Sequence, residues 1–127
     1  SMSGLLDEDV RGLSSFLAYA KALELFDRVA CDVMDLSGRF ELSKLVSQQL
    51  ASADSIAANI EEGYGRDSRK EYAQFLVIAR GSAQETLGRC KRLRHWLPPE
   101  VLAKHAALLN EIIPILTKTI RTLRSRP

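Results

Sequence analysis

Polar side chains between residues 48 and 62 repeat at the spacing of a single helix face. At intervals of 4, 3, 4 and 3 residues they are Gln48, Ser52, Ser55, Asn59 and Glu62, which we call the polar seam. Further along the chain, Ser82 and Glu85 lie three residues apart beside an apolar stripe. Such hydroxyl, amide and carboxylate groups can bond between packed helices, or they can form a solvated helix face. The spacing leaves both interpretations open.

Two of these residues, Glu62 and Glu85, carry carboxylates that could act as a general acid and a general base. That chemistry needs a pocket and a substrate beside them, and the sequence indicates neither. A metal site is also disfavoured, because His95 and His105 lack the helical ligand spacing of His-Glu-x-x-His or Glu-x-x-His. We therefore predict no enzymatic activity, no catalytic residue, no metal, no cofactor and no small-molecule substrate.

Basic side chains are concentrated in the last third of the chain. The formal net charge is only +2, but residues 1–85 carry −5 and residues 86–127 carry +7. The candidates for contact with nucleic-acid phosphates, called the first basic cluster, are Arg66, Arg69, Lys70, Lys118, Arg121, Arg124 and Arg126. A second basic cluster consists of Arg89, Lys91, Arg92, Arg94 and Lys104. The alternative is that both clusters are solvated and only offset helix dipoles.

Four stretches with helical apolar spacing must position these residues. They are separated by residues 37–39, by residues 63–68 and by the pair Pro98-Pro99. Ser68 and Glu71 form a capping box that begins the third stretch. With connections of about two to six residues, such helices pack as antiparallel neighbours. The predicted fold is an all-α, up-down-up-down four-helix bundle, in which the first basic cluster gathers at one end.

Other sequence features refine this bundle. Pro114 is expected to bend the fourth helix, whereas Gly81 and Gly88 indicate either a close backbone approach or simple tolerance of weak helix formers. The first and fourth helices are apolar over a wider arc than a bundle core needs. That excess predicts a homo-oligomer.

The length of 127 residues predicts a single domain over residues 1–127. Residues 1–12 are expected to be disordered or in part a tag remnant, because the opening Ser-Met-Ser is typical of an expression scar. Cys31 and Cys90 are interpreted as two buried small hydrophobes in a reducing compartment. No apolar run has the length of a membrane span and no targeting segment is evident, so we expect a cytoplasmic protein.

The junction of the second and third helices carries the most specific run of the chain. It reads Ser55-Ile56, Asn59-Ile60, Glu62-Gly63-Tyr64-Gly65-Arg66 and Ser68, followed by Glu71-Tyr72, Phe75-Leu76, Ile78-Ala79, Gly81-Ser82 and Glu85. This run closely resembles the bacterial four-helix-bundle proteins encoded by intervening sequences of large-subunit ribosomal RNA genes. Many relatives have Pro or Ser where Ala57 and Ala58 stand here. More distantly, the chain resembles the accessory protein of diversity-generating retroelements, a basic pentameric bundle that partners a reverse transcriptase and binds nucleic acid.

The family resemblance implies a left-handed bundle that assembles into a cyclic homo-oligomer, a pentamer, without supplying an enzymatic activity. It implies that Gly63, Gly65 and Arg66 shape the turn. It also favours a buried polar network or interface formed by Ser55, Asn59, Glu62, Ser82 and Glu85.

Two functions remain in competition. The preferred one is an oligomeric bundle that binds ribosomal or other structured RNA, or a protein handling it, through its basic clusters. The alternative is an assembly module or accessory factor for an RNA-processing enzyme or a reverse transcriptase, without direct contact to nucleic acid.

Overall fold

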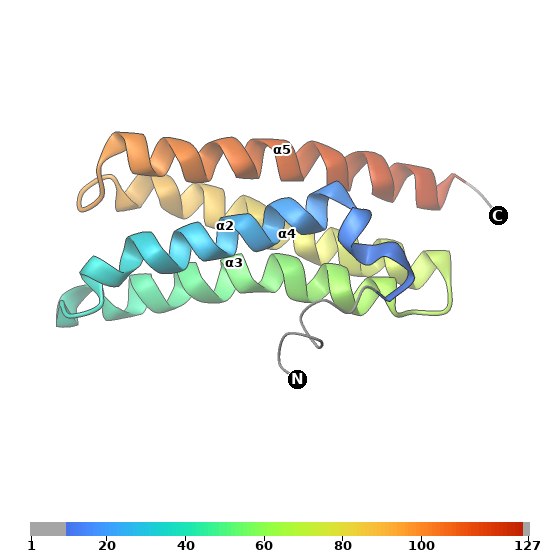
Figure 1. The fold of residues 1–127 in the computed structure, drawn as a ribbon, viewed down its shortest axis with the longest axis horizontal. Coiled ribbons are helices and arrows are strands. Elements are labelled where there is room, and N and C mark those ends of the chain that lie inside the picture. The colour runs from blue at the N-terminus through green and yellow to red at the C-terminus, as the bar shows by residue number, and fades with distance from the viewer. Residues whose placement is uncertain (1–9, 126–127) are drawn as a thin grey trace.

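Four long α-helices account for most of residues 10–125, the part of the chain that the computed structural model describes. They are α2 (Leu17–Val33), α3 (Ser43–Tyr64), α4 (Arg69–Leu93) and α5 (Pro99–Arg124). Short 3-10 helices are η1 (Val10–Ser15), η2 (Met34–Leu36) and η3 (Phe40–Leu42). No strand occurs in these residues, and consecutive long helices run in opposite directions (Figure 1). The prediction of an all-α chain with four helices is therefore confirmed.

Local signals place most of the helix ends. At the start of α4, the backbone N–H of Glu71 donates to Ser68 Oγ at 3.1 Å, and Pro99 is the first residue of α5. The first apolar stretch ends earlier than its spacing suggests, because α2 stops at Val33 and the chain turns through η2 and η3. The Trp96 and Leu97 N–H groups both donate to the Leu93 carbonyl, which ends α4 before Pro98.

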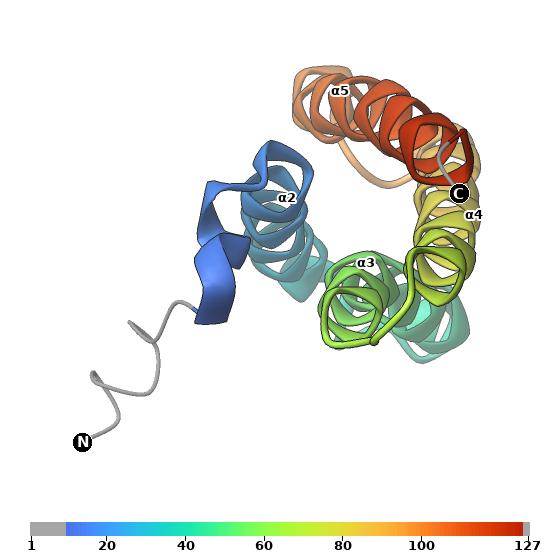
Figure 2. The same ribbon diagram turned by 90° about the vertical axis from the view of Figure 1, so that its right-hand side faces the viewer.

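One apolar stripe from each long helix forms the core. Leu25, Ile56, Leu76 and Leu109, one from each helix, are fully buried. Figure 2 views the bundle along its length, with α2, α3, α4 and α5 following one another around the core. Each helix contacts the next, and α5 also contacts α2. All four helices are therefore needed to enclose the core.

Two polar pairs join α2 and α5, the first and last of the long helices, where they pack against each other. Lys21 of α2 forms an ion pair with Glu111 of α5. His105 Nε2 of α5 lies 2.7 Å from Asp32 Oδ2 of α2, and the imidazole is completely buried. His105 is thus a packed core residue held by one carboxylate.

Several sequence expectations need correction. A Cβ added at Gly81 or Gly88 would meet nothing within 4 Å, so these glycines are tolerated and do not mark a close approach. Cys90 is buried as expected, but Cys31 is exposed. The expected disorder of residues 1–12 falls mostly on residues 1–9, outside the described part of the chain, while residues 10–12 belong to η1.

Candidate nucleic-acid interface

Polar contacts between α3 and α4 begin at Gln49, one residue away from the predicted seam. The Gln49 side chain is fully buried, and its Nε2 donates to the Thr86 carbonyl at 3.1 Å. Gln48 is exposed and takes part only through its backbone carbonyl. At this position the seam is a solvated face, one of the two interpretations of its spacing, because the packing rotates α3 so that the neighbouring residue faces α4.

Arg89 is the centre of this contact. Its Nη1 donates to Gln49 Oε1 at 2.8 Å and to Ser52 Oγ at 3.0 Å, and its Nη2 donates to Glu85 Oε2 at 3.1 Å. Only 5% of Arg89 is exposed. The sequence pattern placed Arg89 in the second basic cluster, which was wrong: the guanidinium is used between helices and is not free to meet phosphates.

Further along the two helices, the network is made of hydroxyls. Thr86 Oγ1 donates to Ser52 Oγ at 2.8 Å, and the hydroxyls of Ser55 and Ser82 lie 2.8 Å apart. Asn59 Nδ2 donates to the Ser55 carbonyl and to Ser55 Oγ at 2.8 and 2.9 Å. Ser55, Asn59 and Ser82 thus lie together in a half-buried group, as the interpretation of a polar network expects.

The two carboxylates of the predicted network behave differently from its hydroxyls. Glu62 is exposed and bonds only to Arg66, four residues on, among the contacts of the described residues. It does not reach Ser55, Asn59 or Ser82, so its inclusion was wrong. Glu85 bonds to Arg89, but 57% of its side chain is exposed, which places it at the rim. Glu62 and Glu85 contact different arginines and do not form a pair.

The turn between α3 and α4 depends on one close approach. A Cβ at Gly63 would lie 2.8 Å from Phe75 Cβ and 3.0 Å from Tyr72 Cδ1, so only glycine fits there. Gly65 has an ordinary φ of −82°, and a Cβ there would make contacts of 3.7 Å or more. The Arg66 guanidinium lies 4.8 Å from the centre of the Phe75 ring. Burial raises the pKa of the neighbouring Tyr72 phenol.

The first basic cluster does gather at one end of the bundle, where the α3–α4 turn and the C-terminal end of α5 lie together (Figure 1). We call this region the basic end. Arg66 is partly neutralised there by Glu62, whereas Arg69, Lys70, Lys118, Arg121 and Arg124 are exposed, with no ion pair among the described residues. Arg126 lies outside the described residues. Residues 112–125 contain no acidic side chain.

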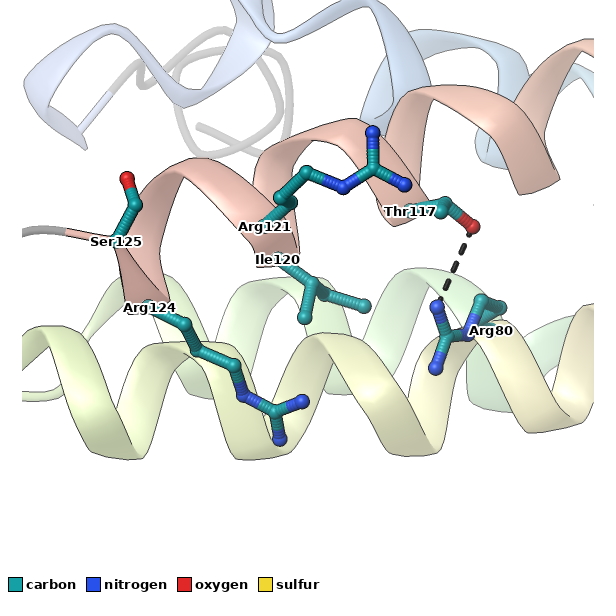
Figure 3. A pocket seen from close by; sticks show the side chains of 6 residues that line it. All are labelled: Arg80, Thr117, Ile120, Arg121, Arg124 and Ser125. Atoms are coloured by element: carbon teal, nitrogen blue, oxygen red, sulfur yellow. Dashed lines mark hydrogen bonds between the residues drawn. The ribbon is translucent and has the colours of Figure 1, made fainter.

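A pocket of about 430 Å³ opens at the basic end between α4 and α5. It is lined by Arg80, Thr117, Ile120, Arg121, Arg124 and Ser125. Arg80 Nη1 donates to Thr117 Oγ1 at 3.3 Å. In Figure 3 the Arg80 and Arg124 side chains lie toward α4 beside Ile120, whereas the Arg121 side chain extends from the other side of α5. Arg80 was missed from the sequence, because it lies 41 residues before Arg121 and only the packing of α4 on α5 brings them together.

The second basic cluster, without Arg89, remains at the opposite end as exposed side chains. Arg94 Nη1 donates to the Lys91 carbonyl at 2.8 Å and Arg92 Nη1 to the Gly88 carbonyl at 3.4 Å. These bonds satisfy carbonyls near the end of α4, as expected for cations that offset a helix dipole.

Some of the apolar excess of α2 stays on the surface. Leu23 of α2 is 43% exposed, and Met34, the first residue of η2 directly after α2, is 65% exposed. Phe40 in η3 is 90% exposed. The excess of the fourth helix is largely covered, since Ile113 and Ile115 of α5 are partly buried and pack against the core.

Other kinds of site find little support in residues 10–125. No three His, Cys, Asp or Glu side chains of this region lie together in a way that could hold a metal ion. No helix in the described region is both long enough and apolar enough to cross a membrane. The arrangement that remains, uncompensated arginine and lysine at one end of a rigid bundle, has the chemistry to bind a polyanion.

Comparison with known proteins agrees with the fold. The sequence model of the family described as 23S rRNA-intervening sequence protein matches residues 15–118. A crystal structure of a protein of unknown function from the S23 ribosomal protein family of Bacteroides thetaiotaomicron is similar, with a TM-score of 0.74 and 25% sequence identity. The similarity covers 83% of this chain and 96% of the other. No curated protein matches the chain.

Proposed function

Because the chain belongs to the 23S rRNA-intervening sequence protein family, we propose that it binds structured RNA, ribosomal RNA included, through the basic end of the bundle and without catalysis. RNA presents a dense row of phosphates, and a protein that neutralises them releases condensed counterions. A rigid helical end with fixed cations can position itself on such a backbone without reading its sequence.

The observation that carries this proposal is the charge of the last turns of α5. Lys118, Arg121 and Arg124 are exposed, no acidic residue follows Glu111 in the chain, and no ion pair holds these cations within residues 10–125. Two arginines lie in the last turn of α5. One such cation would suffice to offset the partial negative charge of about half an electron at a helix C-terminus. The surplus is available to a ligand.

The proposal includes assembly into a cyclic homo-oligomer, a pentamer as the sequence resemblance implies. It is supported by three exposed apolar side chains, Leu23 of α2, Met34 of η2 and Phe40 of η3. A ring would repeat the basic end once per subunit and convert a modest patch into a belt of charge. Light scattering behind a sizing column tests this part, and a 14 kDa species at micromolar protein would refute it.

A salt-titrated electrophoretic shift with an RNA hairpin tests RNA binding. The double variant Arg121→Ala/Arg124→Ala should bind at least about tenfold more weakly, and the slope of log affinity against log salt should fall by about 0.7–0.9 for each phosphate that is no longer neutralised. The matched control is Arg28→Ala/Arg39→Ala, which removes the same charge from two exposed, ion-paired arginines. Absence of binding at low salt, or an equal decrease in affinity in both variants, would refute the proposal.

The second candidate, an accessory factor that binds an RNA-handling protein, is favoured by the same exposed Leu23, Met34 and Phe40. It predicts no RNA binding at low salt, or residual binding that does not depend on Arg121 and Arg124. The double variant therefore discriminates between the two functions.

A further inference from the structure

We infer that the pocket at the basic end binds a phosphomonoester dianion, and, resting on the proposed RNA binding, that this group is the terminal phosphate of an RNA strand. The site combines residues from α4 and α5. Arg80 and Thr117 reach each other across the two helices, and Arg121 and Arg124 line the same pocket. Three positive charges thus line one pocket, and no acidic side chain is among its lining residues.

The number of donors fits a terminal phosphate better than an internal one. A phosphomonoester has three free acceptor oxygens and a charge of about −1.5 to −2 at pH 7, whereas a phosphodiester has one charge and two esterified oxygens. Guanidinium groups bind phosphate oxygens through paired N–H donors. The Thr117 hydroxyl accepts from Arg80 and retains its own proton for a ligand oxygen. A group with three free acceptor oxygens therefore matches the arginine-rich lining of this pocket better than an internal phosphate does.

The local charges also explain why a weakly charged ligand would bind poorly. The C-terminal end of α5 contributes a partial negative charge of about half an electron, because the helix ends at Arg124 beside the pocket. That dipole repels any anion and cancels part of the arginine charge. The attraction that remains scales with ligand charge, so it is larger for a dianion than for a monoanion. The pocket floor at Ile120 is 3% exposed and provides no competing polar group.

The test compares 3′-labelled RNA hairpins that differ only in a 5′-phosphate or a 5′-hydroxyl, by fluorescence anisotropy of the full-length protein. At about pH 7.5 the phosphorylated hairpin should bind about tenfold more tightly, and this preference should fall below about pH 6 as the phosphate dianion takes up one proton and becomes a monoanion. Arg80→Gln should reduce the preference to about twofold or less. Arg80→Lys should restore only part of it, because an ammonium group lacks the paired donors of a guanidinium.

The control variant is Arg28→Gln, which removes an exposed arginine of α2 outside the pocket and should keep the full preference. Equal affinity for the two hairpins, or an unchanged preference in Arg80→Gln, would overturn the terminal-phosphate inference and leave the RNA-binding proposal intact.

A second measurement separates this inference from the proposed function. Adenosine monophosphate, adenosine and inorganic phosphate are added to labelled protein, and the arginine Nε–H resonances are followed by NMR. Adenosine monophosphate and phosphate should shift the signals of Arg80, Arg121 and Arg124, and adenosine should not. If no hairpin binds but these shifts occur, the RNA-binding proposal fails, and the pocket remains a site for the phosphate of a small-molecule phosphomonoester. If neither phosphate-bearing ligand shifts them, the pocket inference fails.

Discussion

The Arg89 guanidinium of α4 donates to Gln49 Oε1 of α3 at 2.8 Å, in a contact with almost no access to solvent. The nitrogen of the same Gln49 side-chain amide, Nε2, donates to the Thr86 carbonyl of α4 at 3.1 Å. Gln49 is therefore held from both sides by α4. Because a buried donor or acceptor is costly when it lacks a partner, a shift of α3 along α4 would break several bonds at once. The contact sets the register of these two helices.

Removal of Arg89 should destabilise the bundle strongly. Arg89→Met keeps an apolar stem but leaves Gln49 Oε1 and Ser52 without their charged donor, so the free energy of unfolding should fall by about 2–4 kcal/mol. Glu85→Gln is the control, because 57% of that side chain is exposed and the decrease should stay below about 1 kcal/mol. Urea unfolding at equal protein concentrations measures both. Equal decreases would argue against the central role of Arg89.

Alanine at two glycines should have opposite effects. Gly63→Ala places a Cβ 2.8 Å from Phe75 Cβ, an atom fixed to the backbone of α4, and should cost about 1–3 kcal/mol through overpacking. Gly81→Ala enters open space in an exposed helix position and should gain about 0.5–1 kcal/mol. Thermal unfolding of the two variants gives the comparison. A stabilised Gly63→Ala variant would contradict the close approach.

The polar seam should divide into residues that matter for stability and residues that do not. Asn59→Ala removes two bonds to Ser55 at a half-buried position and should cost about 1 kcal/mol. Glu62→Ala removes an exposed pair with Arg66 and should change stability by no more than about 0.5 kcal/mol. Chemical unfolding of both variants measures the difference. An Asn59→Ala variant as stable as the parent would restore the interpretation of a solvated face.

Stability should decline at high pH through Tyr19. Burial and the hydrogen bond to Glu61 at 2.7 Å raise the pKa of this phenol to about 12 from 10.0. Below pH 10 the phenol is protonated in both the folded and the unfolded chain, so its contribution is complete. Between pH 10 and 12 the unfolded chain ionises first, and stability falls as pH rises. Tyr19→Phe should make this decline shallower, as measured by urea unfolding across that range; an unchanged slope would exclude Tyr19 as its source.

The two thiols should react at very different rates. Cys31 is exposed, whereas burial raises the pKa of the Cys90 thiol, an effect that the hydrogen bond from Gln49 and the charge of Arg89 only partly offset. Thiolate is the reactive form, so a disulfide reagent should modify Cys31 quickly and Cys90 only on local opening. Cys31→Ser should abolish the fast phase. A fast phase that survives in Cys31→Ser would show that Cys90 is accessible.

Much of the fold was predictable because its signals are local. The Ser68 cap, Pro99 at a first turn and the apolar spacing of each stretch depend on neighbouring residues. With short connections, these helices pack as antiparallel neighbours. The motif around Gly63 identified the family for the same reason, since a short run carries it. The early end of α2 at Val33 was missed, because apolar spacing continues to Leu36 through the 3-10 turn.

The site residues depended on information that a helical pattern does not contain. Periodicity defines the faces of α3, but the rotation at which α3 packs on α4 decided that Gln49 is buried and Gln48 is exposed. In the sequence, Arg89 cannot be distinguished from a surface cation, because its partners Ser52 and Gln49 are 37 and 40 residues away and only the packing of α3 on α4 brings them close. The sequence by itself determined the helices, the turn and the unequal charge of its two parts. Only the tertiary structure decided which cations are used between helices and which, with Arg80, line a pocket, because long-range packing sets the partners of each charge.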